Sequence, residues 1–86
     1  MMTPTIHLNG TGKRALLDEL QTAHAALAAA IDVVRQVTVH GRDYYPQGPA
    51  AYTQARHEMD GRLAALAGVQ ADLQAMYEAL SAQGGR

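Results

Sequence analysis

Residues 39–49, with the sequence VHGRDYYPQGP, separate two long helical patterns and thereby decide the fold. This short stretch contains two glycines and two prolines, which cannot continue a helix, so it must be a loop. On either side, residues 13–38 and 50–82 carry apolar side chains at helical spacing. Two helices joined by one loop predict an all-α antiparallel hairpin.

Each helical pattern repeats its apolar residues in heptads, as a coiled coil does. The first stripe comprises Leu17, Leu20, His24, Leu27, Ile31, Val34 and Thr38. The second comprises Tyr52, Met59, Leu66, Leu73 and Leu80, interleaved with Arg56, Leu63, Gln70 and Tyr77. Further apolar residues widen both stripes: Leu16, Ala23, Ala30 and Val37 in the first, and Ala55, Val69 and Met76 in the second. A two-helix hairpin cannot cover stripes of this width, so we expect a homo-oligomer, most simply a dimeric four-helix bundle.

The second helical pattern also has a face of small residues that includes Gly61 and Gly68. Each of these glycines costs about 1 kcal/mol relative to alanine inside a helix. Two interpretations remain open: the face is solvated, or another helix packs closely against it.

The 86 residues form one small domain, with an extended arm over residues 1–12 and the helical hairpin over residues 13–86. The chain has no cysteine, which excludes a disulfide-stapled module and any site with cysteine ligands. A net charge of −1 argues against binding of long nucleic acids. No apolar run reaches the length of a membrane span, so we expect no membrane partner.

The loop is the first candidate binding site. An antiparallel connection needs about 2–8 residues, whereas this loop has eleven. Arg42 offers a planar set of donors for a phosphate or carboxylate, and the neighbouring tyrosines offer flat faces and hydroxyl groups. The candidate residues are Arg42, Asp43, Tyr44, Tyr45 and Gln47. The alternative is a well-made turn, in which Arg42 pairs with Asp43 or a helix carboxylate.

The arm supplies the second candidate, Asn9, Gly10 and Thr11, just before a helix N-terminus. Backbone N–H groups in such a position bind anions, although the spacing is not that of a P-loop. The alternative is a flexible arm whose Thr11 caps the first helix. Arm and loop lie at opposite ends of one hairpin, but an antiparallel dimer would bring the arm of one chain to the loop of the other. We therefore predict an inter-subunit site.

Catalysis has little support in the sequence, and we expect a protein that is not an enzyme. One serine and no cysteine leave almost no candidate nucleophile. His57 and Asp60 share a helical face, but no second ligand pair accompanies them, so we expect no metal site and no cofactor.

The arm motif HLNGT at residues 7–11 and the loop motif GRDYYPQGP at residues 41–49 resemble those of a functionally uncharacterised family of short bacteriophage and prophage proteins. The resemblance implies a two-helix phage protein in the cytoplasm of the host cell, but no activity. By analogy, small helical oligomers of phages act as sponges that sequester nucleotide signals of host immunity.

These observations lead to two hypotheses about function. The first is a non-enzymatic protein that binds a small anionic, nucleotide-like ligand at the inter-subunit site, as a counter-defence sponge does. The second is a structural or protein-interaction module, in which the hairpin self-associates and the loop is only a turn.

Overall fold

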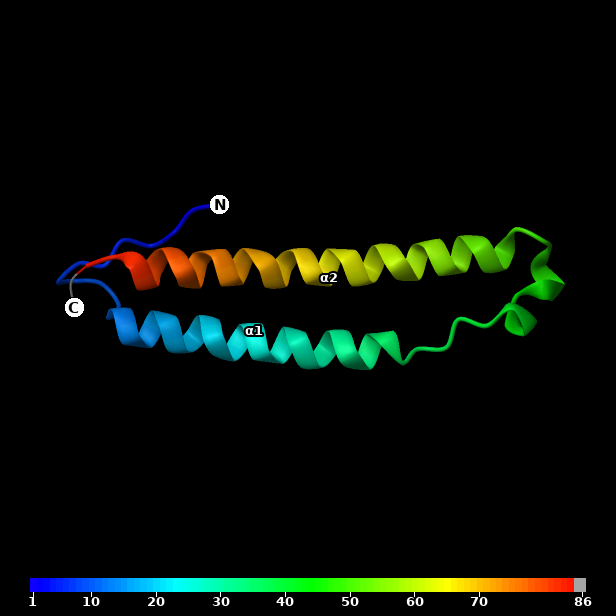
Figure 1. The fold of residues 1–86 in the computed structure, drawn as a ribbon, viewed down its shortest axis with the longest axis horizontal. Helices are drawn as coiled ribbons and strands as arrows, with labels where there is room; N and C mark the ends of the chain where they lie inside the picture. Colours follow the sequence, from blue (N-terminus) through cyan, green and yellow to red (C-terminus); the bar gives the residue numbers. More distant parts are fainter. Residues whose placement is uncertain (85–86) are drawn as a thin grey trace.

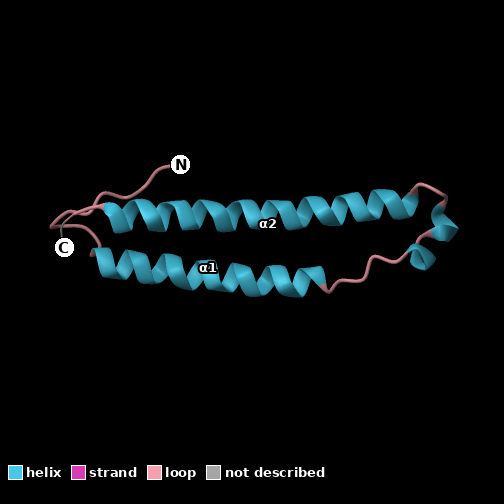
Figure 2. Ribbon diagram, viewed as in Figure 1, coloured by secondary structure: helices cyan, strands magenta, loops and turns pink. Residues whose placement is uncertain are grey.

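The computed structural model describes residues 1–84, and two helices dominate it. Helix α1 spans Lys13–Arg35 and helix α2 spans Ala51–Ala82. They run antiparallel and pack against each other along their length, which confirms the all-helical hairpin (Figures 1 and 2). The predicted hairpin domain extends to residue 86, and residues 85 and 86 lie outside the described part of the chain. No helix in residues 1–84 combines the length and apolar character needed to cross a membrane.

Helix α1 ends three residues earlier than predicted, at Arg35 rather than at residue 38. The N–H of Val37 still donates to the carbonyl of Val34 at 3.1 Å, which closes a last turn before the chain becomes extended. Val37, Thr38 and Val39 are β-branched in succession, and such side chains lose rotamer freedom in a helix. The other helix boundary also moves, because α2 begins at Ala51 instead of residue 50. The connection therefore covers residues 36–50 rather than 39–49.

The connection contains two short 3₁₀ helices, η1 at Gly41–Asp43 and η2 at Tyr45–Gln47. Because α2 is 32 residues long and α1 only 23, the first turns of α2 extend beyond α1 and the connection follows them (Figure 1). Tyr52 and Arg56 of the predicted stripe are exposed as a result, since no helix lies opposite them. Thr38 is also exposed, because it lies in the connection beyond the end of α1.

The remaining stripe residues face the seam between the helices, but the seam is thin. Ile31 and Leu80 are the buried hydrophobic residues of the described chain, with 6% and 0% of their surface exposed. Most other seam residues, Leu27 and Leu66 among them, are half-buried. The molecule measures 62 × 20 × 17 Å, and its radius of gyration of 19.0 Å exceeds the roughly 12 Å of a compact chain of this length.

Two details at the helix surfaces complete the description. The N-cap of α1 is Gly12 rather than Thr11, and no side chain caps the helix there. On α2, open space surrounds Gly61 and Gly68, so within one chain their face is solvated.

Candidate functional site

The N-terminal arm is attached to the end of α2. The N–H of Ile6 donates to Oε1 of Gln83 at 2.9 Å, and Nε2 of Gln83 donates to the carbonyl of Pro4 at 2.8 Å. Pro4 and Ile6 are two residues apart in an extended chain, so their hydrogen-bonding groups share one edge. One glutamine side chain thus holds the arm at the end of the hairpin where α1 begins and α2 ends (Figure 1).

The predicted arm residues Asn9, Gly10 and Thr11 are all exposed. Asn9 and Gly10 lie within a tight turn in which the N–H of Gly10 donates to the carbonyl of His7 at 3.2 Å, and Thr11 follows it. A Cβ atom at Gly10 would come within 2.6 Å of Nε2 of His7, so the folded-back imidazole requires glycine or must move. Because His7 is exposed and its side chain can move away, this contact alone does not require glycine at position 10.

The connection presents most of the predicted loop residues to solvent: Arg42, Asp43, Tyr45 and Gln47 are exposed, and Tyr44 is half-buried. Local hydrogen bonds define its shape. Nδ1 of His40 accepts the N–H of Arg42 at 3.2 Å and caps η1. Gly48 has a φ of 115° and a ψ of 166°, a conformation that is essentially restricted to glycine. The loop conformation is thus specified by its own residues.

Arg42 makes no ion pair within residues 1–84. The ion pairs of this part of the chain join Arg35 to Asp32 at 3.8 Å and Arg56 to Asp60 at 3.7 Å, both within one helix. The alternative in which Arg42 pairs with Asp43 or a helix carboxylate is therefore not what the structure contains. The guanidinium is exposed and open to an external anion.

The two predicted halves of the site lie at opposite ends of the rod (Figure 1). The arm lies beside the C-terminus of α2, and the connection lies beside its N-terminus. One chain alone therefore does not bring Asn9 and Arg42 together.

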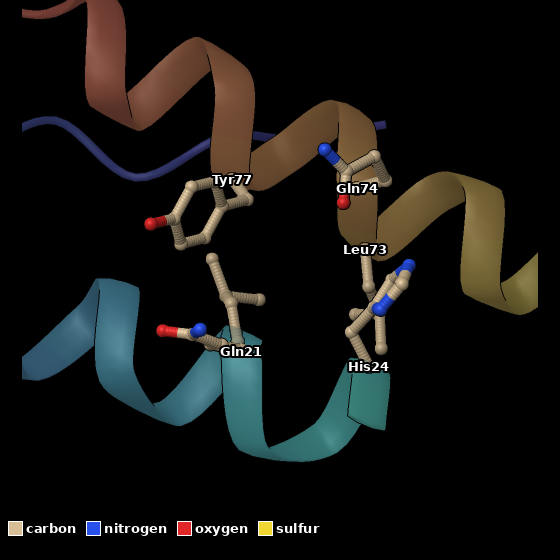
Figure 3. A pocket seen from close by; sticks show the side chains of 6 residues that line it. Gln21, His24, Leu73, Gln74 and Tyr77 are labelled. Atoms are coloured by element: carbon tan, nitrogen blue, oxygen red, sulfur yellow. The ribbon is translucent and has the colours of Figure 1, made fainter. Parts of the chain in front are cut away.

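A hollow between the helices was not predicted from the sequence (Figure 3). It has a volume of about 220 Å³ and is lined by Leu20, Gln21, His24, Leu73, Gln74 and Tyr77. The side chains of His24 and Leu73 lie side by side, while Gln21 and the ring of Tyr77 point toward the same end (Figure 3). The signal in the sequence was the placement of His24 and Tyr77, two polar groups within apolar stripes.

A second hollow adjoins the first and shares Gln21 and Tyr77 with it. Its volume is about 330 Å³, and its lining brings in the basic residues Lys13 and Arg14. Nζ of Lys13 is already engaged: it donates to the carbonyls of Ser81 at 3.1 Å and Gln83 at 2.7 Å. These carbonyls close α2, where a cation is favoured by the helix dipole. Lys13 therefore serves mainly to cap α2.

No protein-family model, curated protein or solved structure matches this chain.

Proposed function

We propose that the chain is a non-enzymatic binding protein for a small anionic, nucleotide-like ligand, and that it works as a homo-oligomer. The observation that carries the proposal is the state of the connection: Arg42 is exposed without an ion pair in residues 1–84, and Tyr45, three residues further along, has 78% of its surface exposed. A guanidinium and an aromatic ring that are both exposed on one short connection suit a ligand that has both a charged group and a planar ring.

Each residue of the proposed site has a role. Arg42 binds the anionic group, and Tyr45 or Tyr44 stacks on the ring. Asp43 and Gln47 contact polar groups of the ligand, and the backbone and side chains of residues 9–11 come from the arm of a second subunit. The hydrogen bond from Arg42 N–H to His40 and the restricted conformation of Gly48 support this assignment, because they fix the loop before a ligand binds.

The resemblance to phage proteins suggests a setting for this activity. A small oligomeric protein that binds a nucleotide without converting it lowers the free concentration of that nucleotide. In a phage, such a protein would sequester an immune signal of the host cell.

The test is calorimetry of the wild-type protein against mononucleotides and cyclic dinucleotides, followed by Arg42→Ala. A charge-assisted contact contributes about 1.5–3 kcal/mol, so we expect Arg42→Ala to weaken binding by about 10-fold or more with an unchanged melting temperature. Arg62→Ala is the matched control, because Arg62 is an exposed arginine on α2, outside the connection. Absence of binding to every anion tested would overturn the proposal.

The second candidate function is a structural or interaction module, and the thin seam favours it. The described hairpin buries the hydrophobic residues Ile31 and Leu80, and a core this small needs a partner that covers more apolar surface. This alternative predicts that Arg42→Ala and Tyr44→Ala lower the melting temperature or change the assembly, with no ligand to lose.

A further inference from the structure

The hollow between the helices combines apolar and polar side chains in its lining. Leu20 and Leu73 form its apolar part, and the other lining residues are polar: Gln21, His24, Gln74 and Tyr77. No aspartate, glutamate, lysine or arginine lines it. The hollow therefore offers a ligand apolar contact and hydrogen bonds without an acidic or strongly basic group.

His24 is the lining residue that the packing of the hairpin does not explain. It is half-buried beside Leu73, and its neighbours along the stripe of α1 are Leu20 and Leu27 (Figure 3). A polar residue in a helix seam specifies the register of the helices when it hydrogen-bonds across the seam. Within residues 1–84 the imidazole of His24 makes no hydrogen bond. Its two ring nitrogens are therefore available to a ligand in the hollow.

The other polar groups of the lining are also available. In the described chain, the side chains of Gln21 and Tyr77 make no hydrogen bond. Nε2 of Gln74 donates to Oε1 of Glu78 at 3.0 Å, and its side-chain oxygen is directed toward α1 (Figure 3). The bond to Glu78 orients this amide, so its oxygen can serve as an acceptor. Both helices thus contribute hydrogen-bonding groups to one hollow.

The size of the hollow limits the ligand. Its volume is about 220 Å³, whereas an apolar cavity of about 150 Å³ in another protein binds benzene. The hollow therefore has room for one six-membered ring with polar substituents. Such a ring can pack its face on Leu20 and Leu73 and direct its polar edge to His24 and Gln74. A pyrimidine base has this shape and this distribution of donors and acceptors.

The adjoining second hollow indicates which substituent the ring carries. The two hollows meet at Gln21 and Tyr77, and Lys13, Arg14 and Asp18 line the second one. Lys13 caps α2, while Arg14 makes no ion pair within residues 1–84. Two basic residues and one carboxylate leave the second hollow with a net positive charge. It therefore favours an anionic group beside Arg14.

We infer that the two hollows form one binding site for a pyrimidine nucleotide, with the base in the first hollow and the phosphate beside Arg14. This inference shares the ligand class of the proposed function but not its residues. Neither Arg42 nor a second subunit takes part, because all the lining residues belong to one hairpin.

The test of the base site is titration with uridine and uridine monophosphate, followed by NMR signals of the Gln21 and Gln74 side chains. A neutral hydrogen bond contributes enough that we expect His24→Leu and Tyr77→Phe each to weaken binding by about 3–10-fold. Both changes retain an apolar side chain or ring in the seam, so we expect the melting temperature not to fall. His57→Leu is the matched control, because His57 is exposed on α2 and lines neither hollow.

Two outcomes would overturn the base site. One is that neither compound shifts the Gln21 and Gln74 signals at millimolar concentration. The other is that His24→Leu and Tyr77→Phe bind as tightly as His57→Leu. The second result would mean that the polar side chains of the hollow do not contact the ligand.

The test of the phosphate site compares the two compounds on wild type and on Arg14→Gln. An exposed ion pair contributes little, so we expect uridine monophosphate to bind about 2–5-fold more tightly than uridine. We expect Arg14→Gln to remove this difference without changing the affinity for uridine. A difference that persists in Arg14→Gln would overturn the placement of the phosphate.

This inference and the proposed function can fail separately. If Arg42→Ala weakens nucleotide binding and His24→Leu does not, the connection is the binding site and the inference about the hollows falls. If His24→Leu weakens binding and Arg42→Ala does not, the hollows bind the nucleotide and the proposed site on the connection falls.

Discussion

The two ends of the rod differ in how many of their side chains are buried or hydrogen-bonded within the chain. At the arm end, Leu80 is completely buried, Lys13 caps the last carbonyls of α2, and Gln83 holds the arm. At the loop end, Val37 and Tyr45 are exposed, and the side-chain hydrogen bond described within the connection is the local one from Arg42 N–H to His40. The arm end therefore stabilises the fold, whereas the loop end leaves its groups exposed to solvent.

The largest expected effect comes from the arm end. We expect Leu80→Ala to lower the free energy of unfolding by about 2–5 kcal/mol, because it removes a fully buried side chain and leaves a cavity. Tyr45→Ala, at the loop end, should change it by less than about 0.5 kcal/mol. Urea denaturation of both variants at one protein concentration measures the contrast. If the two substitutions destabilise equally, the ends do not differ as described.

The next effect concerns the backbone of the loop end. Gly48→Ala forces a Cβ atom into a conformation that costs about 1–3 kcal/mol, so we expect a comparable loss of stability or a rearranged loop. Gly41→Ala is the control, because its φ is not positive and its Cβ would meet the Tyr52 ring at an ordinary 3.9 Å. Thermal melts of the pair report the difference, and a neutral Gly48→Ala would mean that the loop is not fixed by this residue.

The smallest effect returns to the arm end. Lys13→Met keeps the aliphatic part of the side chain but loses the charge that caps α2. A cation at a helix C-terminus contributes about 0.3–1 kcal/mol, so we expect a destabilisation of that size, reduced in high salt. Arg14→Met provides the comparison, since Arg14 is exposed and makes no such contact in residues 1–84. An equal loss in both variants would assign the effect to net charge instead of capping.

The helices could be predicted from the sequence because their periodicity is a local property. The heptad spacing placed Ile31 and Leu80 in the seam, where both are buried. The end of α1 was placed three residues late, because the apolar rhythm continues through Val37 while the β-branched residues that follow oppose the helix. The apolar periodicity alone does not show which of these two effects decides where the helix ends.

The contacts at the arm end could not be predicted in the same way. Lys13 and Ser81 are 68 residues apart, and their contact exists only once the hairpin has closed. The hollow beside His24 and Tyr77 likewise needs the register between the helices, which the sequence of neither helix contains. For the loop, residue types predict which side chains would contact a ligand, and the structure shows that one of them, Arg42, is exposed. Whether a ligand binds there remains the prediction tested above.

The side-chain amide of Gln83 has one further consequence. It carries the same donor and acceptor as a peptide group, and it binds the arm as the edge of a β-strand would. Nothing in these two hydrogen bonds depends on the arm belonging to the same chain. The arm of a neighbouring copy would form the same two bonds, so effective concentration is one of the factors that set the balance between the closed and the exchanged arm. Every copy of the hairpin therefore contains both the arm and the glutamine that binds it, so exchange of arms between subunits would preserve these two hydrogen bonds.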